Sequence, residues 1–151
     1  MSIAFNPDTT ANSIAAVVIS GVTVRDVDEI PQSAQMICPI LFPQPEAWLS
    51  DVTQGAKAVS VADGGQSDFT YILHYVFLLC EAGSGVDQTD PYGNLVSKLK
   101  TVINTILDDD TLAASVEISL NGMDGIGIVQ DPSGNNFWGA LLAFRVLEYA
   151  A

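Results

Sequence analysis

The last stretch of the chain, residues 136–149, is apolar at nearly every position. Apolar side chains at both odd and even positions predict a strand that must be covered on both of its faces. Residues 69–81 have the same character, and at about 3.3 Å per residue they extend on the order of 40 Å. We therefore predict that these two segments pair as long strands of one sheet.

Shorter strands are predicted beside this pair. Residues 58–61 are expected to form a hairpin with 69–81 through the glycine-containing turn at 63–67, although they are too short to pair along its whole length. Residues 34–42 form a further predicted strand. Because proline donates no hydrogen bond to a ladder, Pro39 confines that strand to an edge or a bulge.

The C-terminal third is predicted to be a meander. Residues 116–120 and 126–130 are each predicted to form a short strand. The glycines and polar residues at 121–125 indicate a turn between them. A second turn at 131–135 then leads into the last strand at 136–149.

Helical periodicity is clearest over residues 91–107, where Pro91 suits the first helical position. The apolar residues at this spacing are Tyr92, Leu95, Val96, Leu99, Val102, Ile103, Ile106 and Leu107. The acids at 108–110 are unfavourable at a helix C-terminus, so one of them is expected to cap a short turn at 111–115.

A first helix is predicted over residues 10–20, with Asp8 as its N-cap and Gly21 at its end. Residues 43–57 lack a clear period and are expected to form a long, mobile loop. The pattern as a whole predicts an α+β fold: a single mixed or antiparallel sheet with a long strand and a C-terminal meander, packed by one amphipathic helix plus an N-terminal helix. The chain of 151 residues fits one domain over 1–151.

Composition narrows the class of partner. The chain has 5 basic and 18 acidic residues, a formal charge of −13, which argues against binding to nucleic-acid phosphate. It has no apolar run of about 18 residues for a membrane span and no signal-peptide pattern at its start. Its mean hydropathy of +0.32 is high for so acidic a chain, which indicates that part of its apolar surface meets partners.

Candidate chemistry is sparse. His74 is the only histidine and lies within a predicted strand. The sequence has no Gly-x-Ser-x-Gly motif that would supply a serine nucleophile for it. Cys38 and Cys80 lack metal-site spacing and are predicted to be buried free thiols, with a single bridge left open. No phosphate-binding glycine motif or calcium-loop spacing occurs. We predict no enzyme activity and no catalytic, cofactor-binding or metal site, hence no cofactor.

Five residues are candidates for a protein interface. Trp48 lies in the predicted loop between acids and is either an interface anchor or loop packing. Arg145 interrupts an apolar strand and is either a surface residue on an edge or an ion-pair partner of a neighbouring subunit. Arg25, Glu29 and Glu148 complete the set.

The order of elements resembles the tail terminator proteins of long-tailed bacteriophages. The resemblance rests on an N-terminal helix, the acidic turn at 26–31 leading to the Pro-containing strand ending at 38–43, a long strand, one amphipathic helix and a final meander ending at 144–148. It spans nearly the whole chain and rests on element order, without an invariant signature. Head-closure and tail-completion adaptors of the phage neck are similar in the same way.

The resemblance implies a structural protein of the virion neck, assembled in the host cytoplasm. It implies a ring, hexameric in that family, which caps the tail tube and docks to the head connector. The partners implied are other copies of the chain, the tail tube protein and the connector or head-closure protein, while DNA passes through the ring without specific binding. The resemblance implies no catalytic residue in this chain.

Two rival functions stand beside this one. A small ligand-binding or hydrolytic α+β domain would need a pocket in which carboxylates converge near His74. A generic adaptor would remain a monomer or a dimer.

Overall fold

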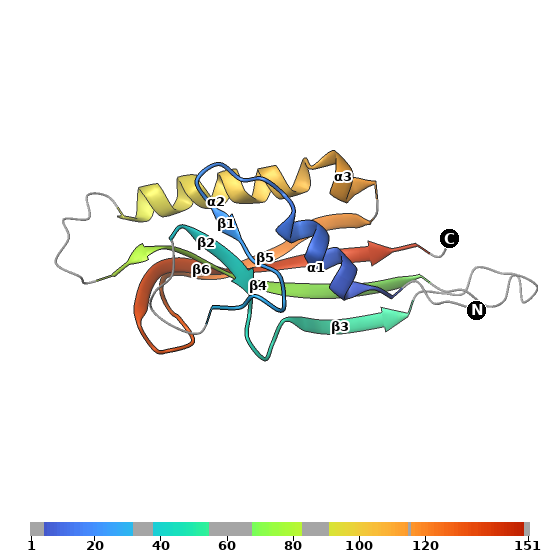
Figure 1. The fold of residues 1–151 in the computed structure, drawn as a ribbon, viewed down its shortest axis with the longest axis horizontal. Helices are drawn as coiled ribbons and strands as arrows, with labels where there is room; N and C mark the ends of the chain where they lie inside the picture. The colour runs from blue at the N-terminus through green and yellow to red at the C-terminus, as the bar shows by residue number, and fades with distance from the viewer. Residues whose placement is uncertain (1–4, 32–37, 55–67, 83–90, 115, 150–151) are drawn as a thin grey trace, which may run out of the picture.

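The computed structural model describes residues 5–31, 38–54, 68–82, 91–114 and 116–149. The elements in these ranges are α1 (Pro7–Ala15), β1 (Thr23–Val24), β2 (Ile40–Pro43), β3 (Leu49–Gln54), β4 (Phe69–Glu81), α2 (Pro91–Leu107), α3 (Asp110–Ala113), β5 (Glu117–Gln130) and β6 (Asn136–Glu148). They form an α+β fold in which the described strands build a single mixed sheet, with the helices on it (Figure 1). The predicted fold class is confirmed.

The sheet has the strand order β1-β2-β4-β6-β5, with β3 pairing β4 beside β2. β1 and β2 are parallel, and the other pairs are antiparallel. The predicted pairing of the two long strands is confirmed, because β4 and β6 run side by side from Phe69–Glu148 to Glu81–Phe137. The predicted helix over 91–107 is confirmed by α2.

The main core lies between the sheet and the helices. Alternate residues of β4, among them Tyr71, Tyr75 and Phe77, point to this side and pack with α1 and α2. The residues between them point to the other face, where Val76 and Leu78 form a second, smaller cluster. Ile30 and Cys38 pack against that cluster, so within the described part of the chain the second face is covered at one end only.

The prediction that the C-terminal strand is covered on both faces is therefore only partly right. Ala140, Leu142, Phe144 and Val146 of β6 are buried under the helices. On the opposite face, Ala143, Leu147 and their neighbours across the ladder are only half-buried.

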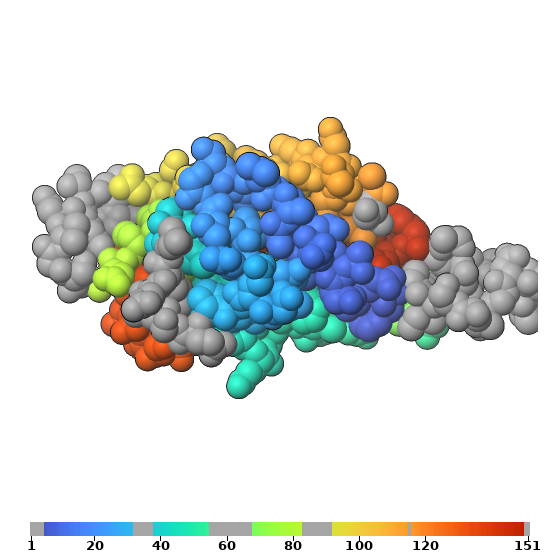
Figure 2. Space-filling view, viewed as in Figure 1, coloured from blue at the N-terminus to red at the C-terminus, as the bar shows by residue number. Residues whose placement is uncertain are grey.

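The predicted first helix, over residues 10–20, begins and ends later than the observed one. α1 begins at Pro7, so Asp8 lies in its first turn rather than at the N-cap, and it ends at Ala15. The residues after Ala16 are no longer helical: Val17 and Ile19 are buried and Val18 between them is 88% exposed, an alternation with the period of a strand. Gly21, at a φ of +72°, then turns the chain so that Ile19 bridges to Val22. In Figure 2, α1 and the chain up to Pro31 cover the middle of the face in view.

Three strand predictions need correction. The loop predicted over 43–57 is wrong for residues 49–54, which form β3 on β4. The turn predicted at 121–125 is wrong, because β5 runs unbroken from Glu117 to Gln130. The predicted strand at 34–42 is shorter, since β2 begins after Pro39 and lies between β1 and β4.

Other predictions at the ends of elements have mixed outcomes. The expected acidic cap is Asp109, whose carboxylate accepts a hydrogen bond of 2.8 Å from the backbone of Leu112 at the start of α3. The turn at 131–135 is present and is organised by buried Asp131, which accepts from the backbone N–H of Ser133 and Asn135. The predicted hairpin strand at 58–61, its turn at 63–67 and residues 34–37 lie outside the described residues.

Candidate assembly interface

The helix-covered side of the sheet carries an apolar groove where α2 meets β5. Val96 and Lys100 of α2 and Met123 and Ile126 of β5 line it, and buried Leu99 and Ile103 form its floor. The hollow measures about 220 Å³. We call these six residues, together with Asn104, which also lines the hollow, the α2–β5 groove.

Exposed apolar side chains gather around this groove. In the described part of the chain, eight large hydrophobic residues are exposed, and five belong to α2 or β5: Tyr92, Val96, Met123, Ile126 and Ile128. They are between 41% and 56% exposed. Tyr92 also packs edge-on against Trp138, with ring centroids 4.9 Å apart. Contiguous apolar surface of this kind is typical of a protein contact.

β5 is also the last strand of the sheet on this side. Its outer edge has no partner among the described strands, so it presents free backbone groups. Two irregularities interrupt its pairing with β6, between Leu120 and Gly122 and between Asp124 and Gly127. Gly125 and Gly127 have positive φ there, which glycine adopts without strain. The glycines that suggested a turn are bulges within a strand.

The other face of the sheet carries Arg145. It lies on β6, an interior strand, and not on an edge as one of the two interpretations required. Its cross-strand neighbours are Ile72 on β4 and Ser119 on β5. The side chain is exposed and has no ion pair within the described ranges. A lone arginine on a half-apolar face remains available to an acidic group of another molecule.

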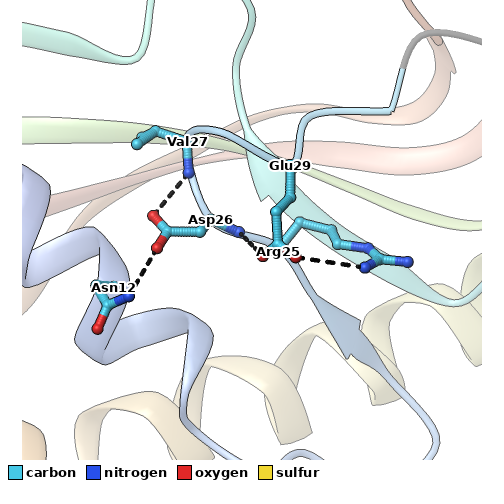
Figure 3. A network of polar contacts seen from close by, with 5 residues as sticks. All are labelled: Asn12, Arg25, Asp26, Val27 and Glu29. Carbon is cyan, nitrogen blue, oxygen red and sulfur yellow. Dashed lines mark hydrogen bonds and ion pairs between the residues drawn. The ribbon is translucent and has the colours of Figure 1, made fainter.

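Arg25 and Glu29 lie together in the turn that follows β1. Their side chains are 3.8 Å apart and exposed, a geometry that contributes little to stability. Asp26 beside them accepts hydrogen bonds from Asn12 of α1 at 2.9 Å and from the backbone of Val27 at 2.7 Å (Figure 3). Glu29 accepts from the backbone of Asp26. The turn is therefore tied to α1, while Arg25 and Glu29 stay open to solvent.

The remaining two candidates point inward. Trp48 is half-buried against the main core, and its buried indole Nε1 and the Tyr75 hydroxyl both lack a hydrogen-bond partner among the described groups. Burial raises the pKa of Tyr75, the charge of Asp26 adds to the rise, and the nearby Trp48 N–H opposes it. Glu148 is only 7% exposed and is hydrogen-bonded inside the protomer. This burial removes Glu148 from the candidate interface.

His74 has one feature that the sequence did not indicate. Its Nε2 lies 2.6 Å from the hydroxyl of Ser50 on β3, a pairing that only the unexpected β3 makes possible. The two residues lie on the second face of the sheet, and His74 and Asp124 line a hollow of about 220 Å³. Among the described residues, no carboxylate accepts a hydrogen bond from the His74 ring.

Cys38 and Cys80 form no disulfide in the described part of the chain, which agrees with the prediction of thiols, but both are partly exposed rather than buried. Burial raises the pKa of Cys38 to about 11, and the nearby charges of Cys80 and Glu81 add to the rise. Burial also raises the pKa of Cys80. Both thiols are therefore protonated and unreactive near neutral pH.

We expect alkylation of Cys38 by iodoacetamide at neutral pH to be roughly tenfold to a hundredfold slower than that of free cysteine, because so little thiolate is present. The rate should rise with pH until about pH 11, where the thiol titrates. Peptide-resolved mass spectrometry measures this for both thiols in one sample, and the urea-unfolded chain is the control. Equal rates in folded and unfolded chain would contradict the prediction.

Metal-ligating side chains do not gather in groups of three or more in the described residues. The acids at 108–110 include the cap Asp109 and line an open surface hollow. Among the described helices, none has the length and apolar character needed to cross a membrane.

Comparison with known proteins does not place the chain in a family: no protein-family model matches it, and no curated protein does.

Two surfaces thus emerge from the structure: the α2–β5 groove with the open edge of β5, and the half-covered second face with Arg145. Sequence reasoning missed the groove because it divided β5 at residues 121–125, which contain Met123. Tyr92 and Val96 were assigned to the buried face of the helix, although both are more than half exposed.

Proposed function

We propose that this chain is a structural subunit of a phage virion neck, which assembles into a ring that caps the tail tube and joins it to the head connector. The observation that carries the proposal is a sheet with open edges, one of them bordered by an apolar groove. Among the described strands, the outer edges of β5 and of β3 both lack a partner. A contact between unlike edges joins subunits head to tail and can close into a ring.

The order of elements supports the phage assignment. A short helix, an acidic turn into a strand, a long strand and an amphipathic helix follow one another as in the tail terminator resemblance, and two long antiparallel strands stand where its final meander was expected. The net charge of −13 suits a channel through which DNA passes, since acids in the bore repel phosphate and leave no site for it to bind.

Native mass spectrometry and electron microscopy of the purified chain test the proposal, first alone and then mixed with the tail tube protein encoded in the same genome. We expect rings, six-fold in symmetry, either free or at the ends of tubes. In a further sample with the connector protein, binding to the connector without binding to the tube would instead indicate a head-closure or tail-completion adaptor. A chain that stays monomeric or dimeric in both samples would refute ring formation.

The pairing of Ser50 with His74 favours one second candidate, a hydrolytic domain. A serine hydroxyl 2.6 Å from an imidazole nitrogen has the distance of a nucleophile and its base. Hydrolysis of p-nitrophenyl acetate by the purified chain, abolished by both Ser50→Ala and His74→Ala without loss of assembly, would support this candidate. On the ring proposal the pair only joins β3 to β4, and neither variant changes the background rate.

A further inference from the structure

We propose that the α2–β5 groove receives the outer edge of β3 from a second copy of the chain, so that copies join head to tail. This inference rests on the self-assembly in the proposed function and names the two surfaces that meet. The groove and β3 lie on opposite sides of the β4–β6 pair in the strand order. In Figure 1, β3 lies at the bottom of the sheet and α2 at the top.

The groove is suited to an apolar side chain next to an acid. Its walls, Val96 on α2 and Met123 and Ile126 on β5, are exposed, and its floor is buried and apolar. Lys100 lines the same hollow and is one of only 5 basic residues in the chain. Lys100 has no ion pair within the described ranges.

The edge of β3 offers that combination. The ladder between β3 and β4 is irregular between Ser50 and Thr53, so the two residues between them, Asp51 and Val52, have no partner on β4. Val52 is 46% exposed, and Asp51 is exposed with a φ of +52°. A backbone strained in this way commonly marks a functional position.

The two surfaces complement each other in polarity and charge. Val52 of one copy fills the hollow between Val96 and Met123 of the next, and Asp51 then lies near Lys100. The contact is between unlike surfaces, so a growing row of copies keeps a free groove at one end and a free edge at the other until the ring closes. Two copies related by a two-fold axis would instead use the same surface twice.

Matched substitutions test the contact. Val52→Glu blocks the edge, and Met123→Glu blocks the groove. Val18→Glu is the control, because Val18 is an exposed valine outside both surfaces. All three sites are exposed, so we expect unchanged thermal unfolding. Native mass spectrometry should show rings for the wild type and Val18→Glu, and monomers for each of the other two variants.

An equimolar mixture of the two blocked variants gives the decisive result. Val52→Glu keeps an intact groove and Met123→Glu keeps an intact edge, so the mixture should form a one-to-one dimer that grows no further. If only Met123→Glu prevents assembly, the groove binds a second groove. If only Val52→Glu prevents it, edge binds edge. Either result overturns the head-to-tail contact.

A charge pair adds an independent readout. Lys100→Ala and Asp51→Asn should each weaken assembly several-fold, and the double variant should be no weaker than either single one, since both remove the same contact. Asparagine is chosen because it tolerates positive φ. Additive effects would contradict the pairing. Assembly that survives in both blocked variants overturns this inference alone, whereas a wild-type chain that never assembles, even with tube protein, overturns the proposed function as well.

Discussion

Replacement of Gly139 by alanine is expected to lower the free energy of unfolding by at least about 3 kcal/mol, the upper end of the usual cost of overpacking. Gly139 faces Leu78 across the β4–β6 ladder, beside the irregularity between Leu78 and Cys80. A Cβ atom on Gly139 would overlap the carbonyl oxygen of Phe77 and lie 3.2 Å from its carbonyl carbon. Because the obstacle is the backbone of a paired strand, the two long strands would have to shift apart.

Gly122→Ala is the matched control, and urea unfolding followed by circular dichroism measures both variants. Gly122 also lies in the sheet, on β5, but nothing lies within 4 Å of the position that its Cβ would take. We expect it to be neutral or up to about 1 kcal/mol more stable, because alanine restricts the unfolded chain. Equal stability of the two variants would show that β4 and β6 do not approach closely at Gly139.

The parts of the fold that the sequence predicts are those with a strong local pattern. The largely apolar run at 69–81 and the helical spacing at 91–107 each determine an element without help from the rest of the chain. β3 has no such pattern, because Leu49 and Ser50 are half-buried and all its residues from Asp51 onward are exposed. It is a strand because β4 needs a partner along residues 69–73, a requirement that arises only in the folded sheet.

The candidate interface was less predictable than the fold, for a related reason. Exposure of an apolar residue depends on what packs around it, so Val96 and Leu99, one helical turn apart, look alike in the sequence but differ in the structure. Glu148 shows the opposite case. It was named as an interface candidate from the sequence, whereas the structure gives it partners within the same chain, Tyr71 and Asn6.

The network around Glu148 joins the two ends of the described chain. Its Oε2 accepts hydrogen bonds of 2.7 Å from the Tyr71 hydroxyl and from the backbone of Asn6, which precedes α1. When the Tyr71 proton goes to Glu148, the hydroxyl of Thr10, 2.8 Å away, is the donor to Tyr71. The same Thr10 proton is also within reach of the carbonyl oxygen of Asn6, at the longer distance of 3.3 Å. Burial is the main cause that raises the pKa of Tyr71, and the charge of Glu148 adds to it. α1 is thereby anchored to β4 and β6.

Glu148→Ala is therefore expected to lower the free energy of unfolding by about 3 kcal/mol, because it leaves the buried hydroxyl of Tyr71 and the partly buried backbone N–H of Asn6 without their acceptor. Glu148→Gln keeps an acceptor oxygen and should lose less. The control is Glu117→Ala, because Glu117 also accepts from a tyrosine, Tyr149, at 2.6 Å, but at the exposed surface. Urea unfolding should place Glu117→Ala within error of the wild type, since water replaces the lost bond there. If both alanine variants lose the same stability, burial is not what makes the Glu148 network strong.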